Sequence, residues 1–295
     1  MMAGVSQVSV VDWIQGARLR TLPLAIAPVV LGASSAILAG AWNLGLALLA
    51  LVVALALQIG VNFANDYSDG IRGTDDVRVG PARLTGSGRV KPELVKRAAW
   101  IAFALAGVAG VIVVVVSAQW ELLLIGAAAI AAAWFYTGGA SPYGYRGLGE
   151  IVVFVFFGPV ATVGTAWLLI GSIPVESWLT GSAAGFFASA VLLVNNIRDI
   201  DQDRLAHKRT LAVWLGSVAS KVLLVVLLVL PYVIVGVLSF VFVWAPLVLL
   251  TGIITIVVIV IVLLSKTPKD LINALGVMSL NALVFALALG AALVW

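Results

Sequence analysis

Two segments of the chain carry asparagine and aspartate at helical spacing. The residues recur at i, i+3, i+4 and i+7, and then at i, i+1, i+4 and i+8: Asn62, Asn65, Asp66 and Asp69, followed by Asn195, Asn196, Asp199 and Asp203. Each set therefore falls on one face of a helix. Carboxylates on one face repel each other unless a cation lies between them, and oxygen donors without a histidine or cysteine cluster suit Mg²⁺. Because Mg²⁺ usually binds through a few carboxylates and phosphate oxygens, the two faces predict a phosphate-containing substrate.

Basic residues lie beside both acidic faces. In residues 78–91, three arginines and one lysine lie among three glycines. Glycine allows the backbone to approach an anion closely, and the basic side chains supply charge for the phosphate oxygens that a metal leaves free. A further stretch, residues 136–150, has five glycines and three tyrosines around Arg146. Both stretches are therefore candidate parts of a binding site.

A plainer interpretation is open for some of these residues. Solvated loop charge explains Asp75, Asp76 and Asp201, and Asn195 is equally explained by a hydrogen bond between helices. Any single arginine is explained by a role in setting the membrane topology alone. Tyrosines beside turn glycines are typical of an aromatic belt at the membrane interface. Solvated loops do not explain two asparagine-led acidic faces that are built alike.

Membrane helices must position these faces. Of the 295 residues, 63% are hydrophobic and 10% are charged, and the mean hydropathy is +1.17, whereas soluble domains carry about 25% charged residues. Hydrophobic runs long enough to cross a hydrocarbon layer of about 30 Å predict nine spans, at 22–39, 43–63, 99–117, 120–137, 150–171, 178–196, 217–239, 244–264 and 271–294. We therefore expect an all-α polytopic membrane protein, a single domain over residues 1–295, with nine transmembrane helices around a central cavity.

The distribution of charge predicts the orientation. All 17 lysines and arginines fall before the first span or in alternate loops, so the N-terminus and both acidic loops (65–97 and 197–210) are expected in the cytoplasm. Residues 1–20 are expected to form an interfacial segment. The net charge of +4 follows from this topology, and no nucleic-acid partner is expected. The absence of cysteine excludes disulfides and thiolate chemistry, and nothing in the sequence indicates an oligomeric state.

Four segments of the chain resemble the UbiA superfamily of intramembrane aromatic prenyltransferases, whose members have nine helices and two aspartate-rich motifs. They are NDYSDGIRGTDD at 65–76, RVGPARLTGSGRV at 78–90, YTGGASPYGYRGLGE at 136–150 and NNIRDIDQDRLAHKRTLAVWLG at 195–216. The resemblance covers most of the chain and is strongest to the branch that prenylates 1,4-dihydroxy-2-naphthoate. Where the first superfamily motif often has a third aspartate, this chain has Gly73, and the acid is displaced to Asp75 or Asp76.

The resemblance implies a reaction and its location. The protein would transfer a polyprenyl group from polyprenyl diphosphate to 1,4-dihydroxy-2-naphthoate, with loss of CO₂ and diphosphate, to give demethylmenaquinone. It would be a Mg²⁺-dependent enzyme that crosses the lipid bilayer of a bacterial-type cytoplasmic membrane several times, with its active site facing the cytoplasm.

The resemblance also implies roles for individual residues. Those that would bind Mg²⁺ are Asp66, Asp69, Asp199 and Asp203, with Asp75 or Asp76 as a further ligand. Those that would bind the diphosphate are Asn65, Asn196, Arg83, Lys91, Lys208 and Arg209. The two asparagines would do so by supporting the metal cluster. Arg146, with Arg20 as second choice, would bind the carboxylate of the aromatic substrate, and Tyr136 would stabilise cationic character through its ring face.

Three other functions are compatible with parts of the pattern. A sister prenyltransferase would use another acceptor, such as 4-hydroxybenzoate, and residues 78–90 and 136–150 disfavour it only through the resemblance. CDP-alcohol phosphotransferases are also aspartate-rich membrane enzymes, but their D-G-x-x-A-R signature fails after Asp69 and Gly70. A transporter would place charges along a route through both leaflets, whereas the predicted topology puts every basic residue on one side.

Overall fold

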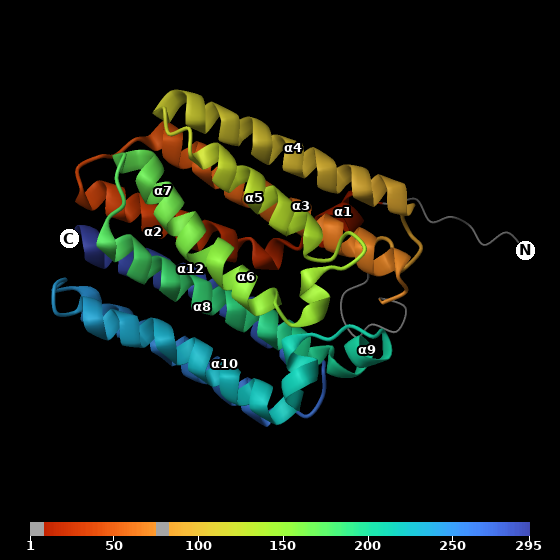
Figure 1. Cartoon of the computed structure of the whole chain (residues 1–295). Helices are drawn as coiled ribbons and strands as arrows, with labels where there is room; N and C mark the ends of the chain where they lie inside the picture. Colours follow the sequence, from red (N-terminus) through yellow and green to blue (C-terminus); the bar gives the residue numbers. More distant parts are fainter. Residues whose placement is uncertain (1–8, 75–82) are drawn as a thin grey trace, which may run out of the picture.

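The computed structural model describes residues 9–74 and 83–295, so the predictions for Asp75 and Asp76 lie outside the described residues. Within these ranges the chain is helical and has no β-strand, and its long helices run along one common direction (Figure 1). Those that are long and apolar enough to span a membrane are α3 (Leu44–Ile71), α4 (Pro92–Ser117), α6 to α7 (Gly149–Ile170), α8 (Val175–Arg198), α10 (Leu211–Leu238), η4 to α11 (Ala245–Leu264) and α12 (Asp270–Val294).

Two further predicted spans correspond to less regular elements. Helix α2 (Pro23–Leu38) follows the segment Val10–Thr21, which comprises α1 (Val10–Ala17) and the turn η1 (Leu19–Thr21), across a bend of 48°. This bent pair is long enough to span only when it is taken as one unit. Helix α5 (Leu122–Phe135) is apolar but has only 14 residues, fewer than the roughly 17–25 that a full span needs. An all-helical membrane bundle is therefore confirmed, while nine crossings and a cytoplasmic N-terminus stay predictions.

Helix α3 continues about two turns past the predicted span, which ended at residue 63, and it ends at Ile71. Its last turns are buried, since Asn65, Asp66 and Asp69 are each at most 9% exposed. The next residues leave the helix, and Gly73 has a φ of 71°, a left-handed conformation that glycine adopts without strain. The first acidic motif is consequently presented by a helix, at fixed spacing, and only the residues after it form a loop.

Helix α8 carries Asn195 and Asn196 and is the most deeply buried of these spans, with 72% of its apolar window inside the protein. The second motif does not lie on one continuous helix as predicted, because α8 ends at Arg198, Asp199 is its C-cap, and Asp203 lies in the short helix α9 (Ile200–Leu205). Helix α8 packs closely against the span from α6 (Gly149–Val155) to α7 (Ala161–Ile170), which is interrupted by a π-helical turn, η3 (Phe156–Val160). A Cβ atom at Gly158 in this turn would lie only 2.6 Å from the carbonyl oxygen of Gly181 in α8. Because such contacts allow few alternative positions, they fix the register of α8 and the direction in which its motif points.

Both motifs lie at the same end of the bundle. Figure 1 shows α1, the short helix α9 (Ile200–Leu205) and the first residues of α4 at this end, and the C-terminus at the opposite one. The acidic ends of α3 and α8 therefore approach each other, as expected for a site that is shared by two similar motifs.

Candidate functional site

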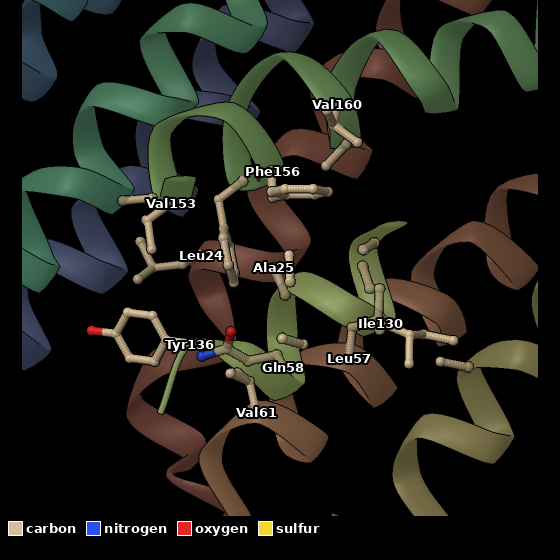
Figure 2. Close-up of a pocket in the computed structure, with 18 of the residues that line it drawn as sticks. Leu24, Ala25, Leu57, Gln58, Val61, Ile130, Tyr136, Val153, Phe156 and Val160 are labelled. Carbon is tan, nitrogen blue, oxygen red and sulfur yellow. The ribbon is translucent and has the colours of Figure 1, made fainter. Parts of the chain in front are cut away.

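The ends of α3 and α8 open into one cavity with a volume of about 540 Å³, within the range of roughly 300–1,000 Å³ that is usual for small-molecule sites. Figure 2 shows its apolar part, where Leu24, Ala25, Val153, Phe156 and Val160 line the same cavity as the polar side chains of Gln58 and Tyr136. The polar lining includes residues of both motifs and their neighbours: Asn65, Asp69, Arg83, Asn196, Arg198, Asp199 and Lys208. The cavity can therefore hold a molecule with a charged head and a long apolar tail.

Asp69 is the aspartate of the α3 motif that lines the cavity. Its Oδ1 accepts a hydrogen bond of 2.7 Å from the hydroxyl of Tyr145, and its Oδ2 lies 3.7 Å from Nη2 of Arg83. Burial and the nearby carboxylate of Asp69 raise the pKa of Tyr145 to about 12, so its hydroxyl remains protonated and able to donate. On the same helix, Asn65 accepts a hydrogen bond of 2.8 Å from Thr137.

Asp66 does not line the cavity, and its carboxylate binds the segment that begins at residue 83. Its two carboxylate oxygens accept hydrogen bonds from the backbone N–H groups of Leu84 (2.9 Å) and Thr85 (2.8 Å). Gly70, one turn later, leaves room for this loop, because a Cβ there would lie 2.4 Å from Cγ2 of Thr85 and 3.1 Å from the backbone nitrogen of Gly86. Asp66 and Gly70 together hold the segment that brings Arg83 to Asp69.

Replacing Gly70 with alanine is expected to slow any reaction that takes place in this cavity about tenfold, because displacement of a positioning loop by an ångström has effects of this order or larger. The added methyl group would push the backbone near Thr85 away from α3 and break its hydrogen bond to Asp66. Gly236→Ala is the matched control, since a Cβ at Gly236 would meet no atom of the described chain within 4 Å. Equal reaction rates in the two variants would contradict this account of the loop.

The α8 motif is held by partners that differ from those of the α3 motif. Asp199 lines the cavity and forms two hydrogen bonds with the guanidinium of Arg198, of 2.7 and 2.5 Å. Asn196 donates a hydrogen bond of 2.8 Å to Oε1 of the buried Glu150 at the start of α6. Asp203, one turn further in α9, is 3% exposed and faces Lys208 rather than the cavity.

Lys208 links the two motifs electrostatically. Its Nζ lies 3.4 Å from Oδ1 of Asp203 and 5.3 Å from the ring centroid of Tyr145, the residue that donates to Asp69. Although burial opposes the charge, the carboxylates of Asp69 and Asp203 keep the pKa of Lys208 above its ordinary value. This end of the cavity therefore stabilises positive charge with carboxylates from both α3 and α9.

The oxygen atoms that line the cavity are of the type that binds Mg²⁺, provided that a phosphate group supplies further ligands to the ion. No cluster of three or more acidic, histidine or cysteine side chains surrounds a single point in the part of the chain that the structure describes. The cavity nevertheless presents two carboxylates, Asp69 and Asp199, together with the carboxamides of Asn65 and Asn196. Mg²⁺ is commonly bound by only one or two carboxylates, with substrate phosphates and water completing its six ligands.

The other predicted site residues are placed outside this cavity. Lys91, Arg209, Arg146 and Arg20 are exposed, and none of them is part of the lining. Arg146 contacts Ser141, and the backbone N–H of Arg209 donates to the carbonyl of Tyr145. Their predicted contacts with substrates, like metal binding by Asp66 and Asp203, stay predictions.

The structure also identifies lining residues that the sequence pattern did not, namely Arg18, Gln58 and Arg198. Gln58 lies one turn before Asn62 on the same face of α3, and Arg198 immediately precedes Asp199. Extending the helical face by one turn toward the N-terminus would have found Gln58. Arg18 has no such signal, because it lies at the turn between α1 and α2.

Comparisons with known proteins agree with this geometry. The profile of the UbiA prenyltransferase family matches residues 25–285. The chain is 52% identical over 215 residues to the 1,4-dihydroxy-2-naphthoate octaprenyltransferase of Mycobacterium tuberculosis, which covers 73% of each chain. It is 40% identical to the Escherichia coli protein of the same name, over 71% of this chain and 70% of the relative. A solved UbiA homolog from Archaeoglobus fulgidus, bound to GPP and Mg²⁺, shares the fold with a TM-score of 0.69 at 15% identity, over 96% of this chain and 99% of the homolog.

Proposed function

Because the chain belongs to the UbiA prenyltransferase family, we infer that it transfers a polyprenyl group from a polyprenyl diphosphate to 1,4-dihydroxy-2-naphthoate in menaquinone biosynthesis. The observation that carries this inference is the identity of 52% and 40% to two proteins named for prenyl transfer to that acceptor. The cavity supports it, because one end is lined by charged groups of both motifs while the rest is apolar. A polyprenyl diphosphate has the same division between its head and its tail.

The diphosphate is assigned to the polar end of the cavity. Arg83 and Lys208, which both line it, supply positive charge for phosphate oxygens, and Asp69 and Tyr145 hold these two side chains in place. As the bond between prenyl C1 and the diphosphate oxygen breaks, its electron pair moves to the diphosphate, and the two cations stabilise the added negative charge.

Mg²⁺ is proposed as the cofactor, held by Asp69 and Asp199 with support from Asn65 and Asn196. When bound, it would supply further positive charge to the departing diphosphate. The proposal is supported by the oxygen donors in the cavity and by the family relationship to a homolog bound to Mg²⁺.

The apolar part of the cavity suits the carbon chemistry. Loss of diphosphate leaves cationic character on prenyl C1, and the ring face of Tyr136 is available to stabilise it. The acceptor ring carbon that bears the carboxylate donates an electron pair to C1, and CO₂ then leaves its bonding pair in the ring. Side chains such as Phe156 and Val153 exclude water, which would otherwise capture the cation.

The polar end is proposed to face the cytoplasm of a bacterial-type membrane. The loops at this end carry the basic residues that the positive-inside rule places on the cytoplasmic side. The polar acceptor would then enter from water, while the prenyl tail remains among apolar helices.

A direct test combines the purified full chain in nanodiscs with 1,4-dihydroxy-2-naphthoate, a radiolabelled polyprenyl diphosphate and either Mg²⁺ or EDTA. We expect a lipid-soluble radioactive product with Mg²⁺, release of CO₂ in equal amount, and no product with EDTA. Product with 4-hydroxybenzoate but not with the naphthoate would overturn the assigned acceptor, and product of equal yield in EDTA would overturn the metal requirement.

A further inference from the structure

We propose that Gln58 is a specificity-determining residue whose side-chain carbonyl accepts a hydrogen bond from the 4-hydroxyl of the aromatic acceptor. The inference rests on the proposed function, since it concerns the acceptor of that reaction. Gln58 lines the cavity from α3 (Figure 2) and is only 5% exposed. Its Oε1 is buried and has no hydrogen-bond partner among the residues that the structure describes, whereas its Nε2 donates a hydrogen bond to Thr21.

The hydrogen atoms available for hydrogen bonding determine the orientation of the Gln58 carboxamide. The hydroxyl of Thr21 donates its single hydrogen to the backbone carbonyl of Arg18, at 2.9 Å. The carbonyl oxygen of Arg18 can only accept a hydrogen bond, so the hydrogen must come from Thr21. Thr21 Oγ1 must therefore accept in its other two contacts, from Nε2 of Gln58 at 2.7 Å and from Nδ2 of Asn62 at 3.2 Å. A flipped Gln58 would place its oxygen against an oxygen that has no hydrogen left to donate. The nitrogen side consequently faces Thr21, and Oε1 is left for another donor.

An unsatisfied buried carbonyl oxygen is unusual, because leaving such an acceptor without a donor costs roughly 1–3 kcal/mol. The group selects the chemistry of its ligand: a carbonyl oxygen repels phosphate and carboxylate oxygens and binds a neutral O–H or N–H donor. Of the two substrates, only the dihydroxynaphthoate carries such a donor. Its 1-hydroxyl is adjacent to the carboxylate and bonds to it internally, so the 4-hydroxyl is the donor that remains free.

The position of Gln58 agrees with this assignment. Gln58, Asn62, Asn65 and Asp69 follow one another at i, i+4, i+7 and i+11 along one face of α3. Gln58 is seven residues before Asn65, which corresponds to about 10 Å along the helix axis. It therefore lies deeper than the diphosphate end and shares the cavity with Tyr136, where the acceptor ring must meet prenyl C1.

Asn281 provides a matched control. It is also a buried carboxamide, 2% exposed, whose nitrogen donates to a threonine hydroxyl (Thr255, 2.7 Å) and whose Oδ1 has no hydrogen-bond partner within residues 9–74 and 83–295. It lies in α12 and is not part of the cavity lining. Replacing it removes the same chemical group from the membrane core without touching the cavity.

The test compares Gln58→Met, which keeps the side-chain length and removes the acceptor, with Asn281→Leu and the unmodified protein. We expect Gln58→Met to raise the KM for 1,4-dihydroxy-2-naphthoate about 3- to 10-fold, as for the loss of one neutral hydrogen bond, and to leave the KM for the prenyl diphosphate unchanged. The inhibition constant of 1-hydroxy-2-naphthoate, which lacks the 4-hydroxyl, should be the same in all three proteins. Asn281→Leu should leave both KM values unchanged.

Other results of these measurements would overturn either the role of Gln58 or the proposed function. Equal weakening of both aromatic ligands would overturn the proposal, because Gln58 would then only shape the cavity. A lower kcat with an unchanged acceptor KM would also overturn it and indicate that the carbonyl acts on the developing cation. If Gln58→Met does not fold, Thr21→Val removes the hydroxyl that orients the carboxamide, and the same selective rise in acceptor KM is expected. Failure of the unmodified protein to prenylate the naphthoate would instead contradict the proposed function.

Discussion

Replacement of Asp69 by asparagine is expected to lower the rate of prenyl transfer by about a hundredfold to a thousandfold, the usual loss when a group that organises transition-state charge is removed. Asp69 is the carboxylate of the α3 motif that lines the cavity, and it positions Tyr145 and Arg83 on either side. Asparagine has nearly the same size and can still accept the hydrogen bond from Tyr145. The variant should therefore fold normally and lose the negative charge that the proposed Mg²⁺ requires.

The matched control is Asp201→Asn, because the side chain of Asp201 is 87% exposed and its ion pair with Arg204 is a 3.9 Å surface contact. Its activity should equal that of the unmodified protein. The measurement is the rate of Mg²⁺-dependent product formation over a range of Mg²⁺ concentrations, with thermal unfolding in detergent as the check on folding. A folded Asp69→Asn protein with full activity would rule out Asp69 as a metal-binding residue and remove one of the two carboxylates on which the proposed site depends.

The shared cavity could be predicted from sequence because the spacing of its residues is a property of single helices. Asn65 and Asp69 in α3, and Asn196 and Asp199 at the end of α8, were expected to face a common site, and they do line one cavity. The period of the helix fixes the direction of each side chain once the helix is recognised. For the same reason the apolar runs predicted most helix ends to within a few residues, but α3 continues past its predicted end, and α4 and α10 begin well before their predicted starts at 99 and 217.

Roles that depend on loops were not accessible in this way. Asp66 shares the helical spacing of Asp69, yet its carboxylate is occupied by the backbone of Leu84 and Thr85, which a sequence pattern cannot show. The spacing of Arg146 and Arg20 gave no direction either, since each lies in a short 3₁₀ turn, and the structure places both at the surface. The sequence pattern did not identify Gln58, because a single carboxamide in an apolar run barely changes the mean hydropathy of that run.

Replacement of Lys208 by methionine is expected to impair both stability and catalysis. Lys208 lies 3.4 Å from Asp203 and near Asp69, and its side chain is 13% exposed. Removing one partner of a buried ion pair leaves an uncompensated charge, which typically lowers the free energy of unfolding by about 3–5 kcal/mol. Because Lys208 also lines the cavity where the diphosphate is proposed to bind, the rate of prenyl transfer should fall by about a hundredfold as well.

A second substitution separates these two effects. In the double variant Lys208→Met with Asp203→Asn, the buried carboxylate loses its charge together with its partner, so the thermal unfolding temperature should recover toward that of the unmodified protein. Activity should remain low, since the cation that faces the diphosphate is still missing. Lys269→Met is the control, because Lys269 is exposed at the start of α12 and lies outside the cavity lining. If the double variant regains activity together with stability, Lys208 acts only by neutralising Asp203, and the diphosphate must be bound by other groups.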